Sequence, residues 1–154
     1  MITKATIDSF FKNKRIAVIG ASANKEKYGN MLMKELLKSG YDAVPVNING
    51  GTIEGREAVK AVREIKPKAD VAIAVVPPAA LEGVVEDAAA SGIKTIWMHE
   101  HVMKGVSNPK AIALADSKGM EVITGFCPMM FLPGSMFFHK IHGFVLKIMG
   151  GYPK

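Results

Sequence analysis

Short, mostly apolar runs alternate with longer stretches of helical periodicity along most of this chain. Five runs, each ending at residues that favour turns, fit buried strands: Arg15–Ile19, Tyr41–Val46, Ala69–Val76, Thr95–Met98 and Glu121–Thr124. They recur about every twenty-five residues, the spacing of βαβ units in which helices connect parallel strands. The sequence therefore predicts an α/β fold: a Rossmann-like, doubly wound parallel sheet of five strands in three αβα layers with right-handed crossovers.

Helices are predicted where apolar residues recur every three or four positions. The candidate segments are 3–12, 27–39, 57–65, 79–91 and 109–118, of which 57–65 has the weakest pattern. Pro45 lies inside the second strand, and because proline lacks an N–H it favours a strand end or an edge strand. Residues 129–154 are rich in Met, Phe and His and predict a C-terminal helical extension docked on the domain. A dimer surface and a membrane-surface helix are the alternatives for this extension.

The composition narrows the class of protein. The 154 residues fit a single domain, 1–154, whose first 13 residues supply an N-terminal helix. Hydrophobic content of 49% with charged content of 22% is typical of a globular chain, and no apolar run is long enough to span a membrane. Cys127 is the single cysteine and no secretory signal is visible, so we expect a cytoplasmic protein. The net charge of +6 is dispersed along the chain, which argues against a nucleic-acid surface.

Gly20, Ala21 and Ser22 follow the first strand and precede the first long helix. Small residues let the backbone turn closely there, so that free N–H groups and the positive end of the helix dipole converge on one spot. The turn therefore predicts a binding site for a phosphate or diphosphate. The alternative is a tight βα turn without a ligand. Ligands of such sheets bind beyond the carboxyl ends of the strands, at the point where the strand order reverses.

A dinucleotide ligand fits the sequence poorly. The dinucleotide fingerprint needs G-x-G-x-x-G after the first strand, whereas the glycine that follows Gly20 is Gly29. An NAD site also needs an acidic residue at the end of the second strand, where this chain has Asn47. Asn47 is compatible with NADP, but no arginine follows it until Arg56.

Four segments carry a family resemblance: IAVIGAS (16–22), PVN (45–47), VAIAVVPP (71–78) and IWMHE (96–100). With them the chain resembles the small, single-domain CoA-binding proteins, and it is similar to the N-terminal CoA-binding domain of the succinyl-CoA synthetase alpha subunit. The resemblance implies a Rossmann-like domain that binds coenzyme A or an acyl-CoA. Ligase chemistry in those enzymes requires a second domain with a phosphorylated histidine in a glycine-rich loop, and these residues contain no such loop.

The resemblance also implies which residues contact the ligand. Backbone N–H groups of the turn would hold the diphosphate, nearby lysines would neutralise it, and the later loops would flank the adenosine and pantetheine. The implied contacts are Gly20, Ala21, Ser22, Asn24, Lys25, Lys27, Tyr28, Asn47, Asn49, Val76, Pro77, Pro78, Met98, His99 and Glu100. The chain departs from related domains just after the second strand. It has Asn49-Gly50-Gly51 where those domains often carry a lysine that faces the nucleotide phosphates.

Two further features suggest reactive chemistry. His99-Glu100-His101 could supply an acid–base group or two metal ligands, although polar residues lining a crevice at a strand end explain it better. Cys127 follows the fifth strand, either as a small buried residue or as a thiol near the CoA sulfur that forms a mixed disulfide. We therefore expect no catalytic residue and no metal, and a small-molecule partner with a homodimer as a possibility. The alternatives are an NAD(P)-binding enzyme or redox regulator, and an accessory subunit of an acyl-CoA ligase.

Overall fold

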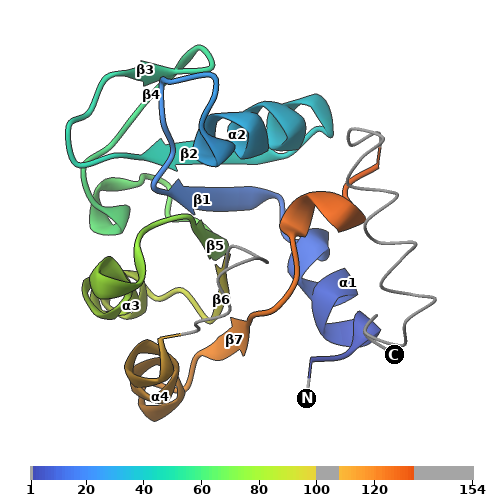
Figure 1. The fold of residues 1–154 in the computed structure, drawn as a ribbon, viewed down its shortest axis with the longest axis vertical. Coiled ribbons are helices and arrows are strands. Elements are labelled where there is room, and N and C mark those ends of the chain that lie inside the picture. The colour runs from blue at the N-terminus through green and yellow to red at the C-terminus, as the bar shows by residue number, and fades with distance from the viewer. Residues whose placement is uncertain (1, 100–107, 134–154) are drawn as a thin grey trace.

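The computed structural model describes residues 2–99 and 108–133. Its centre is a five-stranded parallel sheet with the strand order β2-β1-β5-β6-β7, which confirms the predicted α/β class (Figure 1). The strands of this sheet are β1 (Arg15–Ile19), β2 (Asp42–Val46), β5 (Val71–Ala74), β6 (Thr95–Met98) and β7 (Glu121–Ile123). The order reverses between β1 and β5, because the chain runs outward to β2 and then crosses back over β1.

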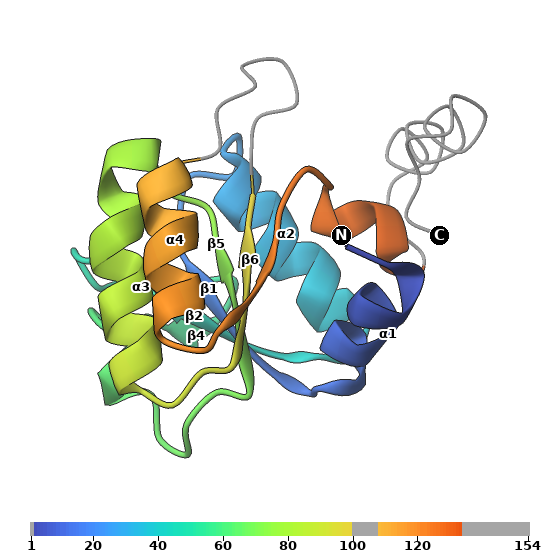
Figure 2. The same cartoon turned by 90° about the horizontal axis from the view of Figure 1, so that it is seen from below.

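Helices cover both faces of the sheet and make the predicted three layers. The helices are α1 (Lys4–Lys12), α2 (Tyr28–Lys38), α3 (Leu81–Ala90) and α4 (Pro109–Ser117), with 3-10 helices η1 (Val62–Glu64), η2 (Pro78–Ala80) and η3 (Pro128–Phe131). Figure 2 shows α3 and α4 on one side of the sheet and α1, α2 and η3 on the other. Among the described residues no helix is both long and apolar enough to cross a membrane.

The alternation of side chains along the strands builds two hydrophobic cores. Ile16 and Val18 of β1 pack with the residues of α1 and α2, whereas Ala17 and Ile19 pack with those of α3 and α4. On β6, Trp97 is fully buried on the α1 side. Both faces of the central strands are therefore apolar, which explains why each strand reads as a continuous apolar run.

The helix predicted over residues 57–65 is wrong. The chain instead makes a small antiparallel hairpin of β3 (Thr52–Ile53) and β4 (Arg56–Glu57), then a bridge to β2, then the single turn η1. Val59 accepts a hydrogen bond from the N–H of Asn47 at 2.9 Å and donates one to the carbonyl of Pro45 at 3.1 Å. These bonds satisfy the outer edge of β2 and hold residue 59 extended, so tertiary pairing overrides the weak helical pattern.

The other sequence-based predictions agree with the structure within a few residues at the element ends. Pro45 lies on β2, which is an edge strand of the sheet, as its missing N–H requires. The N-terminal helix is present as α1. Of the predicted extension 129–154, only residues 129–133 are described, and η3 covers part of them. The predicted C-terminal helix and its dimer and membrane alternatives lie outside the described residues.

Candidate functional site

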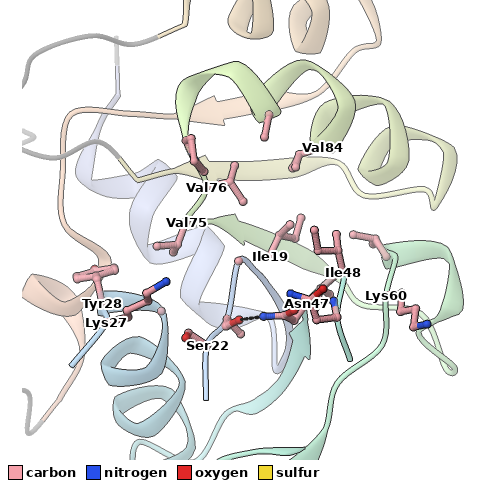
Figure 3. A pocket seen from close by; sticks show the side chains of 18 of the residues that line it. Ile19, Ser22, Lys27, Tyr28, Asn47, Ile48, Lys60, Val75, Val76 and Val84 are labelled. Carbon is pink, nitrogen blue, oxygen red and sulfur yellow. Dashed lines mark hydrogen bonds between the residues drawn. The ribbon is translucent and has the colours of Figure 1, made fainter. Parts of the chain in front are cut away.

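A cavity of about 1050 Å³ opens at the carboxyl edge of the sheet, where the strand order reverses (Figure 3). The loop after β1 leads to α2 on one face, and the loop after β5 leads to α3 on the other, so the two loops leave a crevice between them. The volume is just above the ~300–1,000 Å³ typical of small-molecule sites. The lining residues used below are Gly20, Ala21, Ser22, Lys27, Tyr28, Gly29, Asn47, Ile48, Asn49, Lys60, Val76, Pro77, Gly83 and Asp87.

Two glycines allow the loop after β1 to press against its neighbours. Gly20 has a φ of +88°, and a Cβ there would lie 2.0 Å from the carbonyl oxygen of Val75 in the loop after β5. A Cβ at Gly29, in the first turn of α2, would lie 2.4 Å from the carbonyl oxygen of Gly20. The spacing between Gly20 and Gly29 does not fit the dinucleotide fingerprint. Gly29 nevertheless allows the helix to pack closely on the strand, as the third glycine of that fingerprint does.

Two side-chain amides, from the half-buried Asn47 and the buried Asn30, hold the carbonyls of this loop. Asn47 Nδ2 donates to the carbonyl of Ala21 at 2.8 Å, and Asn30 Nδ2 donates to the carbonyl of Ser22 at 2.8 Å. Within the described part of the chain, the backbone N–H groups of Ala21 and Ser22 make no hydrogen bond. The N-terminus of α2 carries no side-chain cap, and Lys27 stands beside it on the cavity wall. Free N–H groups, a helix N-terminus and a lysine together favour an anion.

The other end of the cavity lies between the loop after β2, η1 and α3. Asn49 and Lys60 line it, and Asp87 of α3 faces the same space. Lys60 was missed by sequence reasoning because it lies far beyond the end of β2 along the chain. The hairpin β3–β4 and the bridge between Val46 and Val59 bring it back to the cavity. Asn30 was missed for a similar reason, since its side chain bonds a loop eight residues earlier.

The structure brings eight of the predicted contact residues to the cavity: Gly20, Ala21, Ser22, Tyr28, Asn47, Asn49, Val76 and Pro77. Lys27, also implied by the resemblance, joins them. Six other predicted residues do not line it: Asn24, Lys25, Pro78, Met98, His99 and Cys127. Glu100 lies outside the described residues.

Each of these six residues has another place in the structure. Asn24 shapes the loop by accepting from the N–H of Glu26 at 2.9 Å, and Lys25 is exposed next to it. Pro78 begins η2, and Met98 is buried in the core beneath α3 and α4. His99 and Cys127 lie one layer behind Tyr28, as the stacking and hydrogen-bond geometry shows.

Tyr28 separates the cavity from the half-buried His99 and the buried Cys127. Its ring stacks on the imidazole of His99, with centroids 3.9 Å apart and planes within 4°. The Tyr28 hydroxyl and Cys127 Sγ share a hydrogen bond of 3.2 Å. Burial, and next the neighbouring thiol, raise the pKa of Tyr28 well above its ordinary value. Burial also raises the pKa of Cys127, although the Tyr28 hydroxyl and the backbone N–H groups of Met129 and Met130 act in the opposite direction.

Cys127 should therefore react slowly in the folded protein. Its side chain belongs to a residue only 6% exposed, and its raised pKa leaves less thiolate at neutral pH than an unfolded cysteine has. We expect iodoacetamide at pH 7.5 to alkylate the native protein at least about tenfold more slowly than the urea-unfolded protein. The native rate should go on rising to a higher pH than the rate for the unfolded thiol, because burial raises the pKa of Cys127. Intact mass against time reads both rates, and equal rates at pH 7.5 would contradict this placement of the thiol.

The described residues contain no group of three or more His, Cys, Asp or Glu side chains placed to hold a metal ion. His101, the second possible metal ligand of the His99-Glu100-His101 cluster, lies outside the described ranges.

Comparison with known proteins identifies a family and several similar proteins. The model of a protein family described as CoA binding domain matches residues 14–133. The alpha subunit of an ADP-forming acetate–CoA ligase I from Pyrococcus furiosus is 40% identical over 97 residues, which are 59% of this chain and 21% of that subunit. A hypothetical protein from Pyrococcus horikoshii OT3 has a structure with a TM-score of 0.76 at 32% identity, covering 83% of this chain and 88% of its own.

A larger solved structure is also similar. The apo form of a dinucleotide forming acetyl-coenzyme A synthetase from Ca. Korarchaeum cryptofilum has a TM-score of 0.65 at 27% identity, covering 75% of this chain. This chain spans about a quarter of that synthetase chain, 27%, and 21% of the ligase subunit.

Proposed function

This chain belongs to the family of CoA-binding domains, and from that premise we propose that its cavity binds coenzyme A or an acyl-CoA. The protein acts as a binding or regulatory module, and no residue is assigned to catalysis. The loop after β1 holds the diphosphate, the far end of the cavity holds the adenosine, and the pantetheine arm runs past Val76 and Pro77 toward Tyr28.

One observation carries the proposal. The N–H groups of Ala21 and Ser22, which make no hydrogen bond within the described residues, lie beside the N-terminus of α2 at the reversal of the strand order. The cavity there has a volume of about 1050 Å³, which is ample for a ligand larger than phosphate. The rim of this cavity gives support of a second kind. Ile48 lines the cavity and is 81% exposed. No other large apolar side chain among the described residues is exposed. An adenine ring against Ile48 would remove this apolar surface from water.

Titration with candidate ligands tests the proposal. Coenzyme A or acetyl-CoA is expected to raise the thermal midpoint of the protein as its concentration rises, because a ligand that binds only the folded state stabilises it by mass action. At about 100 times the Kd, the gain in unfolding free energy is about 2.7 kcal/mol. NADH and NADPH at equal concentration are expected to have no effect. Isothermal titration calorimetry gives the affinity.

The panel distinguishes the alternatives. A midpoint raised by NADH or NADPH and unchanged by every CoA species would overturn the proposal in favour of an NAD(P)-binding enzyme or redox regulator. Coenzyme A and acetyl-CoA differ only by the acetyl group on the sulfur. Equal affinity for both would therefore mean that the protein makes no close contact with the thiol end of the ligand.

An accessory subunit of an acyl-CoA ligase is a second candidate. The similarity to the alpha subunit of an acetate–CoA ligase favours it, since this chain matches a part of that subunit. Affinity purification of the tagged chain from its own cells, followed by mass spectrometry, tests this role. Recovery of ligase subunits at near-equal amounts would support it, and recovery of the chain alone would favour an independent binding protein.

A further inference from the structure

The far end of the cavity combines one cation with one fixed carboxylate. Lys60 is exposed and lines the cavity, and it appears in none of the ion pairs among the described residues. Its backbone N–H donates to Glu64 Oε2 at 3.1 Å, which fixes the position of its main chain. Figure 3 shows its side chain at the same end of the cavity as Asn47 and Ile48, with Nζ turned away from them.

The Lys60 side chain lies over the glycine turn that follows β2. Its Cε is the nearest atom to the place where a Cβ on Gly50 would stand, 3.9 Å away. Gly50 has a φ of +67°, and its N–H donates to the carbonyl of Asn47 at 2.9 Å, so this turn is closed by its own backbone. Residue 60 therefore brings a cation close to Gly50, on a loop that carries no cation of its own.

The Asp87 carboxylate repels an anion from one side of the far end of the cavity. Its Oδ2 accepts a hydrogen bond from the N–H of Val62 at 2.6 Å, which holds the carboxylate against η1. Its nearest cation is Arg63, with Nε 3.9 Å from Oδ1 and a side chain that is 74% exposed. An anionic ligand group is repelled by the Asp87 carboxylate and attracted by Lys60, whereas hydroxyl and amino groups of a ligand suit the Asp87 side.

We infer that Lys60 is the residue that selects a ligand with a second phosphate, the 3′-phosphate of coenzyme A, over the same ligand without it. This inference rests on the proposed function and deepens it. The cavity then has cations at two separate places: Lys27 beside the diphosphate loop and Lys60 beside the ribose phosphate. A dinucleotide with the diphosphate alone engages only the first.

Calorimetric titration of coenzyme A and dephospho-CoA tests the role of Lys60. The wild type is expected to bind coenzyme A about five- to tenfold more tightly than dephospho-CoA, the effect of one partly exposed charge-assisted contact. Lys60→Ala should lose most of this ratio by weakening coenzyme A alone, while the affinity for dephospho-CoA stays unchanged. Because the contact is exposed, raising the salt concentration should shrink the wild-type ratio as well.

Two further variants separate a local contact from a change in net charge. Lys94→Ala removes a lysine just before β6, at the amino ends of the parallel strands and therefore far from the cavity. This variant should leave the ratio of the two affinities at its wild-type value. Asn49→Lys in the Lys60→Ala background places the cation on the loop after β2 and should restore the ratio. Its restoration would show that position, and not the identity of residue 60, determines selectivity.

Each outcome has a defined meaning. Equal wild-type affinity for the two ligands, or a Lys60→Ala variant that weakens both equally, would overturn the role of Lys60 and leave the CoA site intact. Binding of neither ligand by the wild type would overturn the proposed function and this inference with it.

Discussion

Replacing Gly29 by alanine is expected to weaken ligand binding by more than about tenfold and to lower the free energy of unfolding by about 2 kcal/mol, within the range for overpacking. The new Cβ would stand 2.4 Å from the carbonyl oxygen of Gly20. Gly20 cannot retreat, because its own Cα faces the carbonyl of Val75. The first turn of α2 must therefore move away from the loop after β1. Its N–H groups would then leave the position at which we propose that the diphosphate binds.

Gly83→Ala is the matched control. Gly83 is also a helical glycine that lines the cavity, but a Cβ there meets nothing within 4 Å. Alanine is a better helix former, so this variant should unfold at the wild-type urea concentration or higher, with a gain of up to about 1 kcal/mol. Urea unfolding followed by far-ultraviolet circular dichroism measures both variants. Equal losses of stability in the two would show that the close contact at Gly29 has no special role.

Replacing Trp97 by alanine is expected to lower the free energy of unfolding by about 3–5 kcal/mol, the typical loss for a large aromatic core residue. Trp97 is 0% exposed, and its ring packs edge-on against Phe10 with centroids 5.3 Å apart. Its Nε1 donates to the carbonyl of Phe126 at 2.9 Å, so the side chain connects β6, α1 and the segment after β7. Loss of the ring removes the packing partner of α1 and leaves that carbonyl without its donor.

Trp97→Phe separates these two contributions. Phenylalanine keeps most of the ring packing and loses the hydrogen bond to Phe126, so we expect an intermediate loss of about 1–3 kcal/mol. Urea unfolding by circular dichroism measures it, since the fluorescence of the single tryptophan disappears in both variants. A Trp97→Ala variant that loses less than 1 kcal/mol would contradict the central place of this ring in the core.

Local patterns were sufficient for most elements of the fold. The first strand has the same bounds, Arg15–Ile19, in the prediction and in the structure, because a β-branched run followed by glycine is a local signal. The helix α4 begins at Pro109 as predicted, since Asn108 caps it by accepting from the N–H groups of Lys110 and Ala111. Such signals lie within a few residues of the element they specify.

Long-range contacts decided the rest of the fold and part of the site. The segment 57–65 became a hairpin, a bridge and one turn, because the free edge of β2 needed hydrogen bonds that Val59 could supply. The same change carried Lys60 to the cavity. His99 and Cys127 were predicted at the ligand from their positions at strand ends. The ring of Tyr28, which comes from α2, stands in front of both.

The Gly20-Ala21-Ser22 turn depends on both local sequence and long-range contacts. Its small residues alone were enough to predict a close βα turn with free N–H groups, because backbone conformation there depends on the side chains of a few neighbouring residues. Tertiary structure decided what surrounds it. The strand order places β5 next to β1, so that the loop after β5 leaves room for Gly20 but not for a Cβ. Gly29 and Lys60 reach the cavity, and Asn30 reaches the carbonyl of Ser22, through chain packing that the sequence reasoning did not foresee.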